Sequence, residues 1–182
     1  MNPETPKRRH DPERRQRIIE AALEVIATEG VAGASHRRIA EAADVPLGSM
    51  TYHFNGMQEL LVEAFSMFTG AVAASYIERL QAASDLESAQ EAVVDIICGK
   101  VWVSRRNMLL THELYAYAAR NEALQQVQRD WMARSRKALE RHFNARTARA
   151  LDAFIEGAII HNAASSSLLS TAEVRAIVRL IS

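Results

Sequence analysis

The stretch Ser35–Phe54, SHRRIAEAADVPLGSMTYHF, constrains the fold more than any other part of the sequence. Ser35 can cap a helix, because its hydroxyl can accept a hydrogen bond from a free backbone N–H two or three residues further on. Apolar residues then recur at helical spacing and predict one buried stripe, made of Ile39, Ala40 and Ala43. The first half of the stretch therefore predicts a short amphipathic helix.

A proline ends this helix, and a second short helix follows it. Pro46 has no N–H to donate and disfavours helical geometry at Val45. The chain restarts as Leu47–Phe54, in which Met50 and Phe54 lie four residues apart and so share one face. The side chains expected to point outward are Ser49, Thr51, Tyr52 and His53. Two short helices with a shared apolar seam predict a helix-turn-helix.

This two-helix segment resembles the DNA-binding signature of TetR-family transcriptional regulators, roughly T-x-R-x-I-A-x-x-A-G-V-S-x-G-x-x-Y-x-x-F. The positions that agree are Ser35 (in place of Thr), Arg37, Ile39, Ala40, Ala43, Val45, Gly48 and Phe54. Three positions depart from the family: Asp44 replaces the usual turn Gly, Pro46 replaces Ser, and Met57 replaces a common Lys. The last change removes one phosphate contact. The resemblance is specific over residues 13–60, and beyond them it rests on helical layout and length.

Composition favours helices throughout the chain. The 182 residues include only 7 Gly and 4 Pro, which leaves little room for hairpins, and the hydrophobic content of 48% is ordinary for a globular protein. We expect an all-α fold of about nine helices, with an N-terminal three-helix helix-turn-helix head and a C-terminal helical bundle body. The boundary is expected near Asn55–Met57. Residues 1–56 would then form the DNA-binding domain and residues 57–182 the ligand-binding and dimerisation domain.

Capping signals place the other helices. Asp11 followed by Pro12 is a strong helix start, Gly30 is expected to end that first helix, and Asn121 is expected to begin a later one. The predicted capping boxes are Asn55 with Gln58, Ser84 to Glu87, and Ser170 with Glu173. After the turn motif, the expected helices cover about residues 58–82, 85–103, 108–120, 122–143, 147–166 and 171–182.

Positive charge is concentrated near the N-terminus, although the formal net charge is zero. A neutral protein has no general affinity for nucleic acid, but a local basic patch is what phosphate contact needs. The residues of this patch are Lys7, Arg8, Arg9, Arg14, Arg15 and Arg17, with Arg37 and Arg38 beside the predicted turn. We expect the arm that contains Lys7, Arg8 and Arg9 to contact DNA; the alternative is a solvated tail.

Position within the motif predicts which side chains meet double-stranded DNA. The first residues of the second helix of such a motif face base edges, where Leu47 and the ring of Pro46 can touch a thymine methyl. The residues predicted to contact DNA are Ser35, His36 and Arg37 beside phosphates, Pro46, Leu47, Gly48, Ser49 and Thr51 at or near base edges, and Tyr52 and His53 beside phosphates. For each of these side chains the alternative is plain surface exposure.

Two apolar stripes near the C-terminus are candidates for a homodimer interface. Their residues are Leu151, Phe154, Ile155, Ala158 and Ile159 in one helix, and Val174, Ile177, Val178 and Ile181 in the next. The resemblance implies dimerisation through the last two helices. A dimer would place two recognition helices about 34–36 Å apart, in successive major grooves. The alternative is that both stripes fill the core of one chain.

The middle of the chain is rich in aromatic side chains and is a candidate site for an unidentified small-molecule effector. The residues assigned to this site are Phe65, Phe68, Trp102, Met108, His112, Tyr115 and Trp131. Ligand pockets are commonly apolar with a few polar anchors, and His112 is a candidate anchor. The alternative is that these residues are ordinary core or surface.

Catalytic and targeting signals are weak. His112-Glu113 begins like the zinc-protease pattern HExxH, but Ala116 replaces the second His, so no metal site, no cofactor and no enzyme activity are predicted. The single cysteine, Cys98, fits a reducing cytoplasm and is expected to pack as a small apolar residue, with a redox-sensing thiol as the alternative. No signal peptide is expected, and charged and polar residues in Ala153–Leu169 argue against a membrane span there.

These observations predict a ligand-responsive transcriptional regulator that binds a palindromic operator. That it is a repressor is implied by the resemblance alone. Two alternatives stay open: a DNA-binding regulator or architectural protein without a ligand, and a helix-turn-helix that mediates protein contacts only.

Overall fold

The computed structural model describes residues 12–99, 104–164 and 169–182. Within these ranges the chain forms nine helices and no strand, which confirms the all-α prediction. In chain order the helices are α1 (Arg14–Gly33), α2 (His36–Ala42), α3 (Gly48–His53), α4 (Met57–Gln81), α5 (Leu86–Cys98), α7 (Arg105–Ala118), α8 (Glu122–Leu139), α9 (Ala145–Ala164) and α10 (Thr171–Ile181).

Side-chain caps begin several helices where the sequence predicts them. The Ser35 hydroxyl accepts the backbone N–H three residues on, at 3.3 Å, and opens α2. Asn121 accepts the N–H of Leu124 at 3.1 Å and opens α8. Ser170 and Glu173 form a reciprocal capping box at α10. These three caps are confirmed, because each depends only on a few neighbouring residues.

The predicted capping box of Asn55 with Gln58 is wrong. α4 begins after Gly56, which has φ 109° and provides no side-chain cap. The Glu59 carboxylate accepts the N–H of Asn55 at 2.8 Å instead. Gln58 reaches outward and exchanges hydrogen bonds with Asn121, at 2.8 and 2.9 Å. The Gln58 side chain is therefore bonded to Asn121, which is distant in the sequence, and not to the nearby backbone of Asn55.

The start and end of α5 also differ from the prediction. Its cap is Asp85, whose carboxylate accepts the N–H of Ser88 at 2.8 Å, in place of the predicted Ser84–Glu87 box. The helix ends at Cys98, which is exposed rather than packed as an apolar residue. The rest of the predicted helix, residues 100–103, lies outside the described part of the chain.

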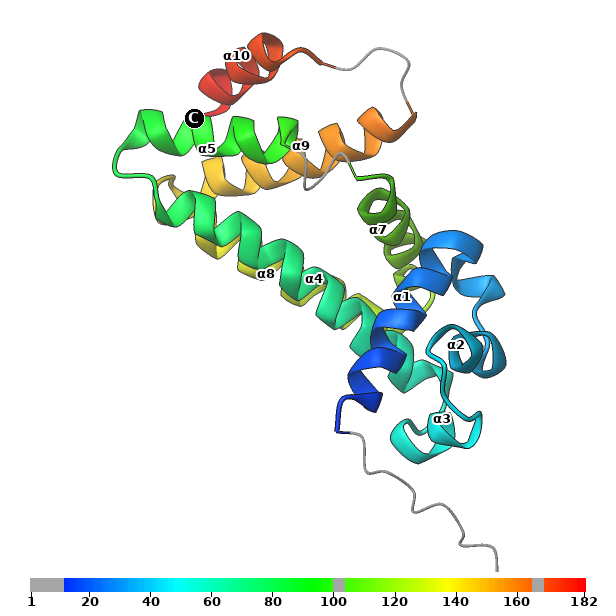
Figure 1. Cartoon of the computed structure of the whole chain (residues 1–182). Helices are drawn as coiled ribbons and strands as arrows, with labels where there is room; N and C mark the ends of the chain where they lie inside the picture. Colours follow the sequence, from blue (N-terminus) through cyan, green and yellow to red (C-terminus); the bar gives the residue numbers. More distant parts are fainter. Residues whose placement is uncertain (1–11, 100–103, 165–168) are drawn as a thin grey trace, which may run out of the picture.

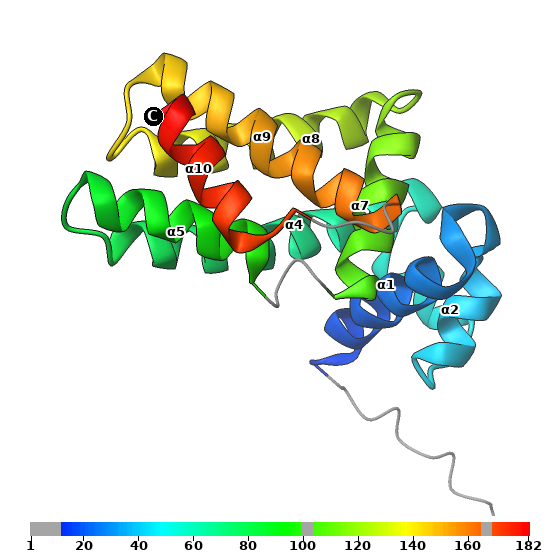
Figure 2. The same ribbon diagram turned by 90° about the horizontal axis from the view of Figure 1, so that it is seen from above.

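Figure 1 shows how α1, α2 and α3 form a small head at one end of the molecule. The head packs on the body through α1, which lies against α4 and α7. At the far end, α10 lies across α5 and α9 (Figure 2). The buried apolar side chains form one continuous cluster that runs from α1 to α10.

The central support of the body is the pair α4 and α8, which lie side by side and run in the same direction (Figure 1). Gln58 and Asn121 join their first turns. The His142 ring, just after α8, bonds the Leu80 carbonyl near the end of α4 at 2.7 Å. The pair is thus connected at both ends.

α4 is the one helix in the described residues that is long and apolar enough to cross a bilayer, by length and composition alone. Half of its most apolar window is buried inside the fold, and Phe65 is 0% exposed. A helix packed on several sides needs apolar residues all round, so this composition is that of a core helix.

Candidate nucleic-acid interface and ligand pocket

The turn between α2 and α3 is closed by backbone hydrogen bonds. Asp44 donates its N–H to the Glu41 carbonyl at 3.2 Å, and Val45 donates to the Ala40 carbonyl at 3.0 Å. This pattern is a Schellman motif, which needs a left-handed residue after the helix. Asp44 supplies that conformation with φ 51°. Asp tolerates positive φ better than most residue types, so the turn keeps its shape without the usual Gly.

α3 presents an exposed surface beside this turn. Met50 and Phe54 are buried, as predicted, and hold the helix against the head. Tyr52 is 81% exposed and Leu47 is 55% exposed. A Cβ atom built on Gly48 would meet no atom within 4 Å, so the surface there is open to close approach. Large apolar groups left this exposed mark a surface that meets a partner.

The structure places most of the predicted DNA-contact residues on one accessible surface, with one correction. Ser49 is only 7% exposed and faces the head, so the prediction that it points outward is wrong. The residues that are exposed or partly exposed are Ser35, His36, Arg37, Pro46, Leu47, Gly48, Thr51, Tyr52 and His53. Lys7, Arg8 and Arg9 lie outside the described residues.

The end of α3 lies in a positive electrostatic field. Burial and then the nearby charges of Arg14 and Arg15 lower the pKa of His53. The Arg15 guanidinium also lies over the ring of Phe54, 5.0 Å from its centre. Two arginines of the basic patch predicted from the sequence, Arg14 and Arg15 of α1, therefore lie near the end of α3.

Several arginines near this surface are paired with carboxylates in the isolated chain. Arg37 pairs with Glu41 at 3.1 Å, and its side chain is 82% exposed. Arg38 pairs with Glu29. Exposed pairs of this kind contribute only about 0–1 kcal/mol, so a phosphate can replace the carboxylate at small cost.

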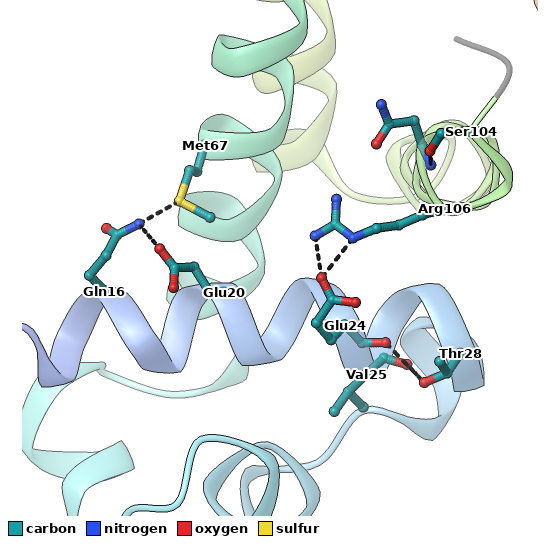
Figure 3. A network of polar contacts seen from close by, with 9 residues as sticks. Gln16, Glu20, Glu24, Val25, Thr28, Met67, Ser104 and Arg106 are labelled. Carbon is teal, nitrogen blue, oxygen red and sulfur yellow. Dashed lines mark hydrogen bonds and ion pairs between the residues drawn. The ribbon is translucent and has the colours of Figure 1, made fainter. Parts of the chain in front are cut away.

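The head is tied to the body by polar contacts of α1 (Figure 3). Arg106 at the start of α7 donates from Nε to Glu24 at 2.7 Å. Gln16 bonds both Glu20 and the Met67 sulfur of α4. These contacts join α1 to the two body helices against which it packs.

A second contact between the head and the body lies where the helical geometry of α1 is interrupted, at Gly30. Gly30 adopts φ 72° and ψ 169°, so the straight part of the helix stops there, as the sequence predicts. The Glu113 carboxylate of α7 accepts the N–H of Val31 at 2.7 Å. A Cβ atom at Gly30 would lie 3.1 Å from the same carboxylate. The glycine therefore permits both the backbone turn and the close approach of α7.

A narrow pocket lies in the body between α4, α7, α8 and α9. Its lining residues are Tyr76, Thr111, Tyr115, Trp131, Ser135, Asp152, Ile155, Glu156, Ile159 and Ile160. The free space is ≈ 10 Å³, about enough for a single water molecule. A more open hollow of ≈ 310 Å³ lies where α1, α4 and α7 meet, and Phe68 is among its lining residues.

Two carboxylates face the narrow pocket from α9. Arg136 donates from Nε to Asp152 at 2.7 Å, and the Tyr115 hydroxyl donates to Glu156. Burial raises the pKa of Asp152, although the pairing with Arg136 opposes the shift. Burial likewise raises the pKa of Glu156, with a smaller contribution in the same direction from Asp152, while the hydrogen bond from Tyr115 and the charge of Arg136 oppose the shift. Burial and the charge of Glu156 also raise the pKa of Tyr115 well above its ordinary value, so its hydroxyl stays protonated.

The predicted ligand residues are only partly brought together here. Tyr115 and Trp131 line the pocket, and Phe68 packs edge-on against Trp131 with ring centres 6.4 Å apart. Phe65 is core rather than pocket lining, Met108 and His112 are partly buried elsewhere on α7, and Trp102 lies outside the described residues.

Sequence reasoning missed Tyr76, Asp152 and Glu156. The sequence did contain a signal for this site. Glu156 interrupts an apolar stretch and lies four residues after Asp152, on the same side of a helix. Carboxylates at that spacing within an apolar helix need a buried partner or a ligand.

The alternative for the C-terminal stripes, that they fill the core of one chain, holds for six of the nine residues. Those that are buried within the single chain are Leu151, Ile155, Ala158, Ile159, Val174 and Val178. Ile155 and Ile159 line the pocket. Phe154, Ile177 and Ile181 are only partly buried and keep exposed surface.

An all-helical chain with a three-helix head, an exposed recognition helix and a separate pocket in the body defines the class of ligand-binding helix-turn-helix regulators. Family comparison agrees: the tetR family of bacterial regulatory proteins matches residues 18–64, and the tetracyclin repressor-like C-terminal domain matches residues 84–181. The chain belongs to the TetR family and is a transcriptional regulator with a DNA-binding helix-turn-helix.

Solved structures support the assignment over nearly the whole chain. The putative transcriptional regulator SCO7518 from Streptomyces coelicolor A3(2) is 48% identical, with a TM-score of 0.89, over 93% of this chain and 98% of that one. The multidrug binding protein EbrR, in complex with ethidium, is 33% identical with a TM-score of 0.77, over 93% of this chain and 98% of that one.

Among curated relatives, the nicotine-responsive repressor HdnoR of Paenarthrobacter nicotinovorans is 28% identical over 60% of this chain and 56% of its own length. The regulator SrpR of Pseudomonas putida is 51% identical over 27% of this chain and 23% of its own. The matches thus span about a quarter to just over half of these relatives.

Proposed function

We propose that this protein is a homodimeric repressor that binds a palindromic operator in the bacterial cytoplasm and releases it when a small molecule occupies the body. The observation that carries the proposal is the exposure of Tyr52 on α3 and of Leu47 just before it, beside a turn flanked by arginines. An apolar and aromatic tip inside a basic surface suits base edges framed by phosphates.

Dimerisation is supported by what remains exposed on the last two helices. Phe154 on α9 and Ile177 and Ile181 on α10 keep solvent-accessible surface. Gly157 lies within α9. A Cβ atom added to it would have no neighbouring atom within 4 Å, so there is room at this position for the close approach of another helix. A twofold dimer would use these residues on both subunits and present two α3 helices to one operator.

Release by a ligand is supported by the position of α7. This helix carries Tyr115 into the pocket and Glu113 to the α1 break, two residues apart in sequence. A ligand that displaces Tyr115 must move α7, and α7 holds the head. The relatives EbrR, with ethidium, and HdnoR, nicotine-responsive, favour a small-molecule effector over a regulator that has none.

The test begins with selection of bound duplexes from random DNA by the full chain. We expect sequences with two inverted half-sites. Replacing Arg37 by Ala should weaken binding and reduce the slope of log affinity against log salt by about 2, because each of the two subunits loses one phosphate contact. Arg146→Ala, an exposed arginine at the start of α9, is the matched control and should change neither quantity.

Absence of any preferred duplex would refute DNA recognition and favour a motif that contacts proteins only. Recovery of single, unpaired half-sites would refute the palindromic operator. A selected operator whose affinity no small molecule changes would favour the architectural alternative.

A further inference from the structure

We propose that the pocket between α4, α7, α8 and α9 binds an aromatic organic cation, with the positive charge of the ligand facing Glu156. The inference rests on the proposed function and names the chemical class of the effector. Three features of the pocket carry it: a carboxylate that has no ion-pair partner among the described residues, an unpartnered buried hydroxyl and aromatic walls.

The first feature is the charge balance. Asp152 is 2% exposed and has its own cation, Arg136, at 2.7 Å. The neutral hydroxyl of Tyr115 donates to Glu156, and among the described residues no arginine, lysine or histidine forms an ion pair with it. The charge of Arg136 also acts on Glu156, but the guanidinium is paired with Asp152. The pocket therefore contains two carboxylates and one guanidinium. A buried carboxylate without a cation must either take up a proton or find a positive partner.

The second feature is the hydroxyl of Tyr76 on α4. This residue is 3% exposed and lines the pocket, yet its oxygen has no hydrogen-bond partner. Burial, with further contributions from Asp152 and Glu156, raises the pKa of Tyr76 well above its ordinary value, so the group is a neutral hydroxyl. Buried hydroxyls are normally satisfied, and one left open toward a pocket points to a ligand that supplies the missing partner.

The third feature is the apolar and aromatic character of the walls. Tyr76, Tyr115 and Trp131 come from three helices, and Ile155 and Ile159 come from a fourth. Aromatic faces attract cations and also stack on flat rings. An anion would be repelled by two carboxylates, and a neutral ring would leave Glu156 uncompensated. An aromatic cation can both stack on the aromatic side chains of the pocket and pair with the negative charge of Glu156.

Because the free volume of the pocket is small, ligand binding there should be coupled to the position of the head. Since ≈ 10 Å³ holds about one water molecule, an aromatic ligand must part the helices that form the walls. Two of them, α4 and α7, are the body helices on which α1 packs. A ligand that enters the pocket and parts α4 and α7 would therefore also move α1 and the head.

The experiment compares two probes of nearly equal shape: the 5-methylphenanthridinium cation and neutral phenanthridine, titrated calorimetrically into the full chain at pH 7.5. We expect the cation to bind the wild type roughly 30-fold more tightly than the neutral ring. Glu156→Gln should abolish this preference while leaving the weak affinity for phenanthridine unchanged. Glu156→Asp should keep it, and Glu140→Gln, an exposed carboxylate after α8, should not alter it.

A second measurement separates charge recognition from a structural role. The affinity of the wild type for the cation should fall as pH is lowered from 7.5 toward 5, because protonation of Glu156 removes its negative charge, and the Glu156→Gln variant should lack this dependence. Equal or tighter binding of phenanthridine by the wild type would overturn the inference, as would failure of the wild type to bind either probe; neither result depends on how a variant folds.

Operator affinity measured on the same samples keeps this inference distinct from the proposed function. If the cation binds through Glu156 but operator affinity does not change, the ligand class stands and the regulatory part of the proposed function fails. If the operator is bound and neither probe binds, the DNA-binding function stands and the ligand class is wrong.

Discussion

Glu156 shows how one side chain can serve binding at the expense of stability. Its carboxyl group is brought into the pocket by the same face of α9 that carries Asp152, and the Tyr115 hydroxyl is its hydrogen-bond donor. A glutamine would keep an oxygen that accepts this hydrogen bond, but it would remove the cost of a buried charge. Residues retained against such a cost are typical of functional sites.

We therefore predict that Glu156→Gln stabilises the ligand-free protein at neutral pH. The pKa of Glu156 is raised in the folded chain, so the folded state binds the proton more tightly than the unfolded state. The free energy of unfolding then falls as pH rises from about 4.5 to the folded-state pKa and is level above it. The groups that face Glu156 are Tyr76, Tyr115, Arg136 and Asp152.

Urea denaturation between pH 4 and pH 8 measures this effect. The difference between Glu156→Gln and the wild type should be small at pH 4 and should grow in favour of the variant as pH rises. A variant that is less stable than the wild type at pH 7.5 would show that the carboxylate is a structural group.

At the scale of an element, α7 connects the two functional regions. Its first turn reaches α1 through Arg106, its middle reaches the α1 break through Glu113, and Tyr115 lies in the pocket. A helix moves as a rigid unit because its backbone hydrogen bonds run along its length. Under the proposed function, displacement of α7 at the pocket would reach the head through these same contacts.

We predict that Glu113→Ala destabilises the fold and weakens the ligand response together. The variant leaves the N–H of Val31 without its acceptor, which costs about 1–3 kcal/mol if water does not replace it. It also removes one of the two polar contacts described between α1 and α7, so an effector should change operator affinity less than in the wild type. Thermal unfolding and operator titrations with and without effector measure the two effects.

Arg105→Ala, an exposed change on the same helix, is the control for the Glu113 variant. An undiminished ligand response in a folded Glu113→Ala protein would place the coupling elsewhere, with α4 the other candidate.

At the scale of the whole molecule, the head and the C-terminal helices lie at opposite ends of the α4–α8 pair (Figure 1). The pair is connected at both ends by hydrogen bonds, from Gln58 to Asn121 and from His142 to the Leu80 carbonyl. A dimer formed through α9 and α10 would thus set the separation of two distant heads. Small rotations within each body would change that separation and the fit to an operator.

We predict that Leu180→Glu, and independently Ile177→Glu, convert the protein to a monomer. Leu180 is 85% exposed, so its replacement removes no packing within the chain, whereas Ile177 is partly buried and also needs a check of folding by circular dichroism. Operator affinity should fall by about 100-fold or more, because two linked half-site contacts become one. Sedimentation and operator titration measure the two effects.

Ala133→Glu, at an exposed position of α8, should leave both the dimer and the operator affinity intact. Dimers that persist in both α10 variants would refute an interface on that helix.

Local signals predicted most of the head, although they placed Ser49 on the outside and it is buried. The Ser35 cap, the break at Pro46 and the spacing of Met50 and Phe54 act within a few residues, so each predicts its own geometry. The same holds for the caps at Asn121 and at Ser170 with Glu173. The family resemblance rests on these residues, and for that reason the fold class was predictable.

Tertiary structure decided which side chains of the body meet. An apolar stripe such as Leu151 and Ile155 reads the same whether it faces the core of its own chain or a second subunit, because periodicity records only that one side is apolar. Likewise, the carboxylates of Asp152 and Glu156 became a pocket only where α9 met Tyr76 of α4 and Tyr115 of α7. Contacts between residues far apart in the chain depend on which helices pack together, and no single segment contains that information.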